Sequence, residues 1–184
     1  DIPPGAAKTG ALGRAAVVQA VAERLAQGRY PLVVDPVMIS KHGARLIADE
    51  AAAALKQRLL PHAYLVTPNL HEAAALSDLA VTDISSMVAA ARAIAELGVP
   101  NVLVKGGHLE GQALDVLWAE GKIQHFASPR VHTQHTHGTG CVYSAAITAC
   151  LALGDDLVSA VRRAKLFVTS AIQTSPQLGH GLGP

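Results

Sequence analysis

Strand-like and helix-like patterns alternate along this chain. Three short apolar runs bounded by turn-forming residues have the pattern of strands buried on both faces of a parallel sheet: 31–35, 63–67 and 101–105. A shorter segment, 6–9, is interpreted as a further strand, and a short helix is expected at 70–76. Elsewhere between the strands, apolar residues recur every three or four positions, as on one face of a helix. The sequence therefore predicts an α/β fold in which helices connect the strands of a mostly parallel sheet.

Capping and helix-breaking residues mark the ends of the connecting helices. Asp49 and Ser85 are placed to cap two helix N-termini. Gly28 and Gly98 follow helix C-termini, and Pro61 is expected to stop the second helix. The residues expected to face inward are Val17, Val18, Val21, Leu25, Leu55, Leu59, Val88, Ala91, Ile94 and Leu97.

The C-terminal half adds a hairpin and two helices. Segments 116–118 and 123–126 flank Glu120-Gly121, which predicts an antiparallel hairpin at one edge of the sheet. A run of small residues, 142–150, predicts a helix that begins directly after a Gly-Thr-Gly turn. A last helix should end before Pro176. Its inward face is expected to consist of Leu157, Val161, Ala164, Val168 and Ile172.

Polar residues gather where the predicted strands end. Asp35, 69–72 and 105–108 each follow a strand, and 138–141 precedes the helix of small residues. Ligands of open parallel sheets bind at the carboxyl ends of the strands. The sequence therefore predicts that these four clusters converge on one site.

The segment 135–141 has the features of an anion-binding turn. Gly138 and Gly140 let the backbone turn so that successive amides point outward, and the first turn of a helix leaves further amides without internal partners. Such a turn can hold a phosphate. The alternative is an ordinary connection between two elements.

Two further clusters suit phosphate chemistry. Asn69 and Glu72 lie three residues apart, where they can order a hydrated magnesium ion or form a helix cap. Asp35 and Glu72 can also serve as a general acid/base pair, although each has a plain structural role as well. Lys105, followed by two glycines, offers a cation for a phosphate chain or is simply exposed.

Composition narrows the classes of function. The 184 residues, half of them hydrophobic and 16% charged, predict a single domain over 1–184. The net charge of +1 without a basic block, and 3% aromatics, disfavour nucleic-acid binding. No apolar run approaches the ~20 residues of a membrane span, so a cytoplasmic location is expected. Cys141 and Cys150, about 13 Å apart if both lie on one helix, are expected to stay reduced.

Three familiar motifs are incomplete. Residues 5–10 have the glycine spacing of a Walker loop but are followed by Ala11-Leu12 in place of Lys-Ser or Lys-Thr. Tyr143 stands where the dinucleotide fingerprint needs a third glycine. A closely spaced trio of histidines completes no metal-ligand pattern and is left without a role. The trio consists of His132, His135 and His137.

Taken together, a glycine turn, an Asn/Glu pair and a strand-end lysine without a Walker loop suggest phosphoryl transfer. The chain resembles the ribokinase-like kinases, a family with a three-layer α/β/α fold, and within them the hydroxymethylpyrimidine and phosphomethylpyrimidine kinases of thiamine biosynthesis. Six motifs in the family's order carry this resemblance. They are Ala7-Lys8-Thr9-Gly10, Asp35-Pro36-Val37-Met38, Val66-Thr67-Pro68-Asn69 with Glu72, Val104-Lys105-Gly106-Gly107-His108, Thr136-His137-Gly138-Thr139-Gly140-Cys141 and Gly179-His180-Gly181.

The resemblance implies roles for the phosphate-binding residues. Gly138, Thr139 and Gly140 would hold the transferring phosphate, with Thr136 in the same motif. Lys105 would contact ATP phosphates. The resemblance also implies that Asn69 and Glu72 order magnesium and its waters and that Asp35 lies close to the same ion.

Further roles concern the substrate and the proton. Most ribokinase-like enzymes have an aspartate base at the position of Cys141, whereas the pyrimidine kinases have a cysteine there, as this sequence does. A helix N-terminus can lower the pKa of a thiol, so the resemblance implies that Cys141 accepts or shares the proton of the substrate hydroxyl. The resemblance implies that Val37 and Gly10 line the pyrimidine pocket, with Ala11 where the family often has methionine. Lys165, on the last helix, would lie near the nucleotide.

The family pattern also includes a segment that this sequence lacks. Family members carry further N-terminal strands and a Gly-Gly-rich loop followed by a glutamine that grips the pyrimidine. We expect that the sequence as given is incomplete. The alternative is a fragment, which would leave a sheet edge and half of the substrate pocket exposed.

The resemblance implies an ATP- and Mg²⁺-dependent kinase, commonly a homodimer. Its expected substrates are 4-amino-5-hydroxymethyl-2-methylpyrimidine and the monophosphate of that compound. One alternative is a pyridoxal or pyridoxine kinase, because these substrates also present a hydroxymethyl group on a flat heteroaromatic ring. The other is a non-catalytic module that binds a vitamin precursor or a nucleotide.

Overall fold

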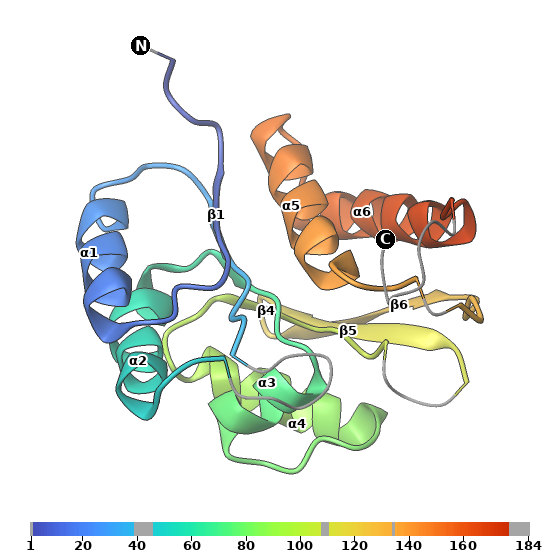
Figure 1. The fold of residues 1–184 in the computed structure, drawn as a ribbon, viewed down its shortest axis with the longest axis horizontal. Coiled ribbons are helices and arrows are strands. Elements are labelled where there is room, and N and C mark those ends of the chain that lie inside the picture. Colours follow the sequence, from blue (N-terminus) through green and yellow to red (C-terminus); the bar gives the residue numbers. More distant parts are fainter. Residues whose placement is uncertain (1, 39–45, 108–110, 134, 177–184) are drawn as a thin grey trace.

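A mixed six-stranded sheet forms the centre of the protein, with its strands in the order of the sequence (Figure 1). The structure is a computed structural model that describes residues 2–38, 46–107, 111–133 and 135–176. Neighbouring strands from β1 to β4 run parallel, and β5 and β6 are antiparallel to their neighbours. The strands are β1 (Ala7–Thr9), β2 (Leu32–Val34), β3 (Leu65–Val66), β4 (Asn101–Val104), β5 (Ala113–Ala119) and β6 (Lys122–Ser128).

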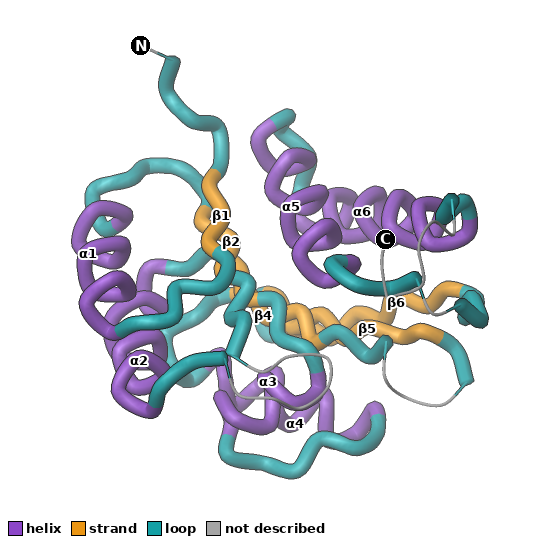
Figure 2. The backbone as a smooth tube through the Cα atoms, in the orientation of Figure 1, coloured by secondary structure: helices purple, strands orange, loops and turns teal. Residues whose placement is uncertain are grey.

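Helices cover both faces of this sheet (Figure 2). The helices α1 to α4 pack on one face, and α5 and α6 pack on the other. This arrangement confirms the predicted three-layer α/β/α architecture. The helices are α1 (Ala15–Leu25), α2 (Asp49–Ala54), α3 (Leu70–Ser77), α4 (Ile84–Ala95), α5 (Thr139–Ala152) and α6 (Leu157–Gln173); α2 continues into a π-helical turn, η1 (Leu55–Leu59), and a 3-10 turn, η2 (Leu60–His62).

Alternation along the strands divides the buried residues into two cores. Val34 and Val66 belong to the core beneath α1 to α4, whereas their neighbours Val33 and Leu65 pack under α5 and α6. Successive side chains of a strand point to opposite faces, so one short apolar run serves both cores. This is why the buried strands are apolar throughout.

Two predicted helix caps are wrong. Asp49 is the first helical residue of α2, and the N-cap position belongs to Ala48. Ser85 lies inside α4, whose N-cap is Asp83. The Asp83 carboxylate accepts from the Ser86 amide at 2.7 Å, and the Ser86 hydroxyl interacts with the Asp83 amide in return. This reciprocal pair satisfies two amides at once, which explains why the helix begins at the earlier residue.

The other helix ends differ only slightly from expectation. Pro61 does not stop the second helix, because it lies inside the 3-10 turn η2 that continues it. Pro61 is near the start of this turn, where the missing amide hydrogen of proline costs no hydrogen bond. On α1, Val18 is buried as expected but Val17 is 37% exposed. The predicted hairpin is confirmed by β5 and β6, whose turn at Glu120 and Gly121 has φ angles of 50° and 76°. No helix in the described part of the chain is long and apolar enough to cross a membrane.

Candidate active site

The carboxyl ends of β2, β3 and β4 bring three predicted clusters together. Asp35 follows β2, Lys105 follows β4, and Lys105 forms an isolated parallel bridge with Asn69 after β3. Asp35 and Lys105 lie two positions after Val33 and Leu103, which pack under α5 and α6. The same alternation directs their side chains toward the start of α5. The predicted convergence of strand ends is therefore confirmed.

Asp35 is the centre of this site. Its side chain is only 2% exposed, and its Oδ1 accepts from Lys105 Nζ at 2.9 Å and from the Thr67 hydroxyl at 3.3 Å. Its Oδ2 accepts from the Ser144 hydroxyl at 3.0 Å and lies 3.9 Å from Lys8 Nζ. Two ammonium groups thus share one buried carboxylate.

Sequence reasoning assigned no site role to Lys8, Thr67 or Ser144. Lys8 and Thr67 had a usable signal, since Thr67 ends its predicted strand, as Lys105 does, and Lys8 lies one position before the end of its own. Ser144 had none, because it was one small residue among many in the helix. Its role depends on the helical turn that also lets its hydroxyl donate to the Cys141 carbonyl at 3.0 Å.

The start of α5 is shaped to receive an anion. Gly138 is the N-cap in the left-handed conformation, with φ of 75°, and as a glycine it has no side chain with which to cap the helix. The Thr139 hydroxyl donates to the Thr136 carbonyl at 2.9 Å and so fixes the turn. A Cβ added at Gly140 would lie 3.3 Å from Lys105 Nζ, so the glycine keeps the space beside the ammonium open. The amides of a first helical turn that follows a glycine N-cap, beside a cation, favour the anion pocket over an ordinary connection.

The Cys141 thiol lies between these groups, with a pKa shift opposite to the one expected. Burial raises its pKa, and the nearby Asp35 carboxylate, within hydrogen-bonding reach of the thiol, raises it further. Lys8 and Lys105 oppose this effect but do not cancel it. The prediction that the helix N-terminus lowers this pKa is therefore wrong, and the group is a protonated thiol at neutral pH.

Asn69 and Glu72 form a complete capping box at the start of α3. The Glu72 amide donates to Asn69 Oδ1 at 2.9 Å, and the Asn69 amide donates to Glu72 Oε2 at 2.8 Å. Glu72 Oε1 accepts from the Met38 amide at 3.4 Å. Burial raises the pKa of Glu72 to about 7, although Lys105 and both backbone hydrogen bonds lower it. Asn69 and Glu72 thus cap the helix, as one of the two predicted roles requires. Glu72 also interacts with Asp35 and Lys105.

Lys165 lies on α6, next to the helix that begins with the phosphate turn, residues 138–140. Its Nζ donates to Asp115 Oδ2 at 2.7 Å and sits 5.9 Å from the centre of the Tyr143 ring. Asp115 Oδ1 accepts from the Gly106 amide at 3.0 Å, directly after Lys105. Lys165 is therefore linked to the site through Asp115, a residue that the sequence analysis did not single out.

The residues predicted to line a pyrimidine pocket are placed near the cluster. A Cβ added at Gly10 would lie 3.4 Å from Lys8 Nζ. The Val37 amide donates to the Asp35 carbonyl at 2.9 Å, and Val37 is partly buried, whereas Ala11 is exposed. These positions form one rim of the site beside Lys8 and Asp35. Their contact with a substrate stays a prediction.

The remaining motifs add little to the site. Within the described ranges, no group of three or more His, Cys, Asp and Glu side chains could hold a metal ion. His132 and His137 are exposed, and His135 is partly buried with an Nδ1 that finds no hydrogen-bond partner in the described structure. His108 and the motif 179–181 lie outside the described residues.

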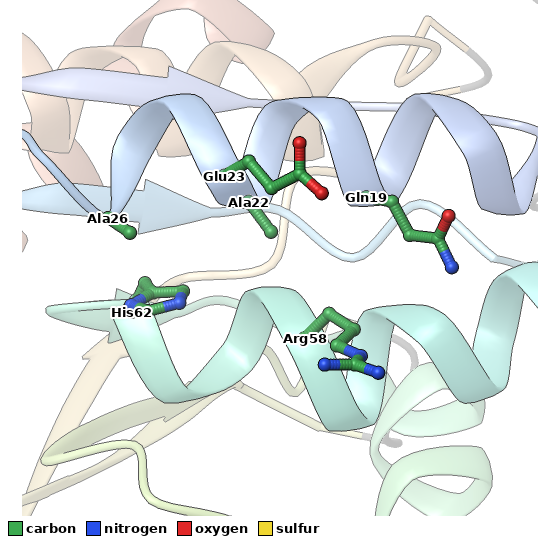
Figure 3. Close-up of a pocket in the computed structure, with 6 residues that line it drawn as sticks. All are labelled: Gln19, Ala22, Glu23, Ala26, Arg58 and His62. Carbon is green, nitrogen blue, oxygen red and sulfur yellow. The ribbon is translucent and has the colours of Figure 1, made fainter.

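A cavity of about 380 Å³ lies between α1 and the segment η1–η2, and no predicted site residue lines it (Figure 3). Its polar groups come from both sides, and small residues of α1 form part of its wall. The lining residues are Gln19, Ala22, Glu23, Ala26, Arg58 and His62.

The strand-end site fits a nucleotide phosphate and a magnesium ion. The open space at Gly140 beside Lys105, together with the amides of the first turn of α5, suits a phosphate. Asp35 directly follows β2, and Glu72 lies in the first turn of α3. They offer two carboxylates, and magnesium is usually held by one or two carboxylates, waters and phosphate oxygens.

Comparison with known proteins gives a consistent result. A family model described as phosphomethylpyrimidine kinase matches residues 1–184. The hydroxymethylpyrimidine/phosphomethylpyrimidine kinase of Haemophilus influenzae is 45% identical, and the match covers all of this chain and 71% of that protein. The thiamine biosynthesis bifunctional protein of Geobacter sulfurreducens is 47% identical, with 100% of this chain but only 38% of that protein covered.

Solved structures confirm the ribokinase-like kinase fold. The pyridoxal kinase of Staphylococcus aureus in complex with ADP has a TM-score of 0.92 at 34% identity and covers 99% of this chain and 67% of its own. The phosphomethylpyrimidine kinase of Clostridium difficile 630 has a TM-score of 0.83 at 38% identity, with coverage of 94% and 71%. The match of the family model to the whole chain, together with these relatives, shows that the chain belongs to the phosphomethylpyrimidine kinase family.

Proposed function

We propose that this chain forms the kinase domain of an enzyme that phosphorylates 4-amino-5-hydroxymethyl-2-methylpyrimidine and then the resulting monophosphate, with ATP as donor. The observation that carries this proposal is the pairing of Asp35 with Lys105 at 2.9 Å beside Gly140, where α5 begins after a glycine N-cap. The names of the relatives supply the substrate. The geometry supplies a reason why phosphoryl transfer belongs at this place.

The chain's own groups would bind the transferring phosphate from two sides. The amides after Gly138, with Thr136 and Thr139 fixing their turn, donate hydrogen bonds to phosphate oxygens. Lys105 adds a charge that is held in place by Asp35. In a loose phosphoryl-transfer transition state, positioning and charge of this kind provide most of the catalysis.

A magnesium ion would be held by Asp35 and Glu72 through water, with Asn69 ordering the Glu72 carboxylate. Both Glu72 oxygens already accept backbone hydrogen bonds, and both Asp35 oxygens accept from side chains, which favours water-mediated contacts over direct ones. The bound ion would supply charge neutralisation at the phosphate oxygens. The raised pKa of Glu72 describes the metal-free protein, where Lys105 offsets the burial of this carboxyl only in part.

The proton of the acceptor hydroxyl has a route to Asp35. One P–O bond forms to the hydroxymethyl oxygen while the bond to the ADP oxygen breaks, and ADP leaves with the electron pair. The hydroxyl proton passes to the Cys141 sulfur as the thiol passes its own proton to Asp35. A relay needs no preformed thiolate, so it is compatible with the raised pKa of Cys141.

The pyrimidine ring would lie against Val37, Gly10 and Ala11, on the rim beside Lys8. Gly10 leaves room next to the Lys8 ammonium, and Val37 offers an apolar surface next to Asp35. The acceptor would thus approach the phosphate turn from the β1 side. Lys165 is paired with Asp115, so it would have to leave this ion pair to make the predicted contact with the nucleotide.

A pyridoxal kinase is the second candidate. The specific observation in its favour is the TM-score of 0.91 with the Staphylococcus aureus pyridoxal kinase bound to AMP-PCP and pyridoxal. Pyridoxal also carries a hydroxymethyl group on a flat heteroaromatic ring. A protein that binds these compounds without turnover is the third outcome.

Coupled ADP release from the full-length protein separates these functions. We expect turnover with the pyrimidine and with its monophosphate in the presence of ATP and Mg²⁺, and loss of turnover with EDTA. Turnover on pyridoxal alone would contradict the first choice. Thermal stabilisation by a ligand without ADP release would identify a binding module.

We also propose that the protein is a cytoplasmic homodimer. The two cysteines are free thiols, as in a reducing compartment, and the exposed Leu166 and Phe167 on α6 offer apolar surface for a subunit contact. Light scattering on the full-length protein measures the mass, and a monomer at micromolar concentration would contradict the dimer.

A further inference from the structure

Lys8 is a charged group inside the site for which the proposed reaction has no task so far. It lies on β1 opposite Val33 of β2, and Val33 packs under α5 and α6. Lys8 therefore points to the same face of the sheet as Asp35, and its Nζ lies 3.9 Å from Asp35 Oδ2. At this distance the two groups form an ion pair but no hydrogen bond. Among the described residues, the N–H donors of the Lys8 ammonium are therefore available for a ligand.

The two lysines of the cluster occupy different sides of Asp35. Lys105 bonds to Oδ1 and borders Gly140 of the phosphate turn. Lys8 faces Oδ2 and borders Gly10, on the rim where the acceptor would lie. Lys8 is also the more open of the two, with a side chain 21% exposed against 13% for Lys105. One cation, Lys105, thus lies on the side of the phosphate donor ATP, and the other, Lys8, lies on the side of the phosphate acceptor.

The second phosphorylation presents a difficulty that the first does not. Its acceptor is a phosphate monoester, which carries negative charge toward a buried carboxylate and toward the phosphates of ATP. Like charges at this distance oppose binding unless a cation lies between them. Lys105 is already engaged on the donor side, so Lys8 is the cation placed to offset this repulsion.

We propose that Lys8 binds the phosphate of the phosphorylated acceptor and thereby makes the second phosphorylation possible. This inference rests on the proposed function, since it assigns Lys8 to one of the two acceptors. Lys8 is a specificity residue in this assignment: the alcohol acceptor has no anionic group for it to bind, whereas the monophosphate does.

The test compares the two acceptors in Lys8→Met, a neutral variant of similar length, in the full-length protein. We expect kcat/KM for the monophosphate to fall by about 10- to 100-fold, mainly through KM, as for the loss of a charge-assisted contact. For the alcohol we expect a clearly smaller loss, because Lys8 affects this reaction only through its ion pair with Asp35, so the ratio of the two losses is the test. The dissociation constant of the monophosphate without nucleotide, measured by calorimetry, should rise by about tenfold or more. Lys8→Arg should restore much of the binding.

Lys122→Met is the matched control. Lys122 is an exposed lysine at the start of β6, which lies at the other end of the sheet because β5 runs antiparallel to β4. It should leave both acceptors unchanged. If Lys8→Met lowers the thermal midpoint, Lys8→Gln provides a second neutral variant on which to repeat the comparison.

Three results would overturn the inference in distinguishable ways. Equal losses for both acceptors would show that Lys8 serves only to balance Asp35. Equal kinetics in wild type and Lys8→Met would show that the acceptor phosphate lies elsewhere. A wild-type protein that phosphorylates neither pyrimidine acceptor would remove the proposed function itself, a failure visible before any variant is made.

Discussion

Asp35 shows how one residue can join groups from distant parts of the sequence. Its two oxygens contact Lys105 and Ser144, which are 70 and 109 positions away. A buried carboxylate needs such partners, because burial without them would cost several kcal/mol. The same contacts fix the ammonium of Lys105 beside the turn of α5. Structural need and phosphate binding therefore depend on the same atoms.

We predict that Cys141→Ala lowers turnover far more than stability. Cys141 is an exposed residue at the start of α5 whose thiol is partly desolvated and within reach of Asp35, so the substitution removes a step of the proton route without opening a large cavity. Loss of general acid–base assistance typically costs about 10²- to 10⁴-fold in kcat. Coupled ADP release gives the rate, and urea unfolding gives the stability.

Cys150→Ala is the control for that substitution. Cys150 is a buried cysteine on the same helix, and it lies beyond the turn that contacts Asp35. We expect this variant to lose some stability and to keep its turnover. Full activity of Cys141→Ala would contradict the proposed proton route and leave Cys141 as a small residue at a helix start.

At the scale of elements, the loop after β4 depends on a close backbone contact. A Cβ added at Gly106 would lie 1.9 Å from the Leu114 carbonyl oxygen of β5, a distance no packing can accept. We predict that Gly106→Ala displaces this loop, lowers the thermal midpoint and reduces turnover at least tenfold, because Lys105 directly precedes it. Thermal unfolding and coupled ADP release check both effects.

The next residue provides a matched comparison. A Cβ added at Gly107 would meet nothing within 4 Å. Gly107→Ala is therefore expected to leave both the thermal midpoint and the turnover nearly unchanged. Equal behaviour of the two variants would show that the loop adapts freely and that its position does not matter for the site.

The pair of Asp115 and Lys165 connects β5 and α6 behind the same loop. Both side chains are buried, so we predict that Lys165→Met and Asp115→Asn each lower the unfolding free energy by about 3 kcal/mol. The double variant should lose less than the sum, because the second change removes a partner that is already unpaired. Urea unfolding of the four proteins gives the coupling energy.

The kinetics of Lys165→Met decide between its two interpretations. A positioning role through Asp115 and the Gly106 amide predicts a lower kcat with little change in KM for ATP. A direct nucleotide contact, as first expected from the family resemblance, predicts a higher KM for ATP. The ion pair at 2.7 Å favours the first result.

The elements were more predictable than their ends. The strand and helix order followed from periodicity because each apolar run and each amphipathic stretch has to be buried. Helix starts followed less well: at α4 the choice between Asp83 and Ser85 depended on which residue could form a reciprocal pair with Ser86. The partner of Lys165 could not be predicted, since it lies 50 positions away on a strand of the hairpin.

For the whole molecule, the sequence predicted where the site lies better than how its groups interact. Strand ends carry Asp35 and Lys105, and a parallel sheet brings such ends to one edge, so the convergence required only the topology. The pKa of Cys141 depended on burial and on Asp35, neither of which is visible in the local sequence. That residues 1–184 form one kinase domain stays a proposal.

The stability of the whole molecule should fall at alkaline pH, in part because of Tyr143. Burial raises the pKa of this phenol well above 10, and the nearby Asp115 raises it further. The hydroxyl makes no hydrogen bond of ordinary geometry within the described structure, although Asp115 lies close enough to affect it. The folded protein therefore keeps the phenol neutral at pH values at which the unfolded chain ionises it.

The sign of the effect follows from this difference. The stability contribution of the neutral phenol is complete below pH 10, and it is lost as the pH rises toward the folded-state pKa, because only the unfolded state releases the proton. With an unfolded pKa near 10, the loss is about 1.4 kcal/mol at pH 11. Tyr143→Phe should lack this loss, while the two cysteines and the other tyrosines contribute equally to both proteins. Urea unfolding at pH 8 and pH 11 measures the difference, and a Tyr143→Phe variant that loses as much stability as the wild type would show that the buried phenol ionises in the folded state.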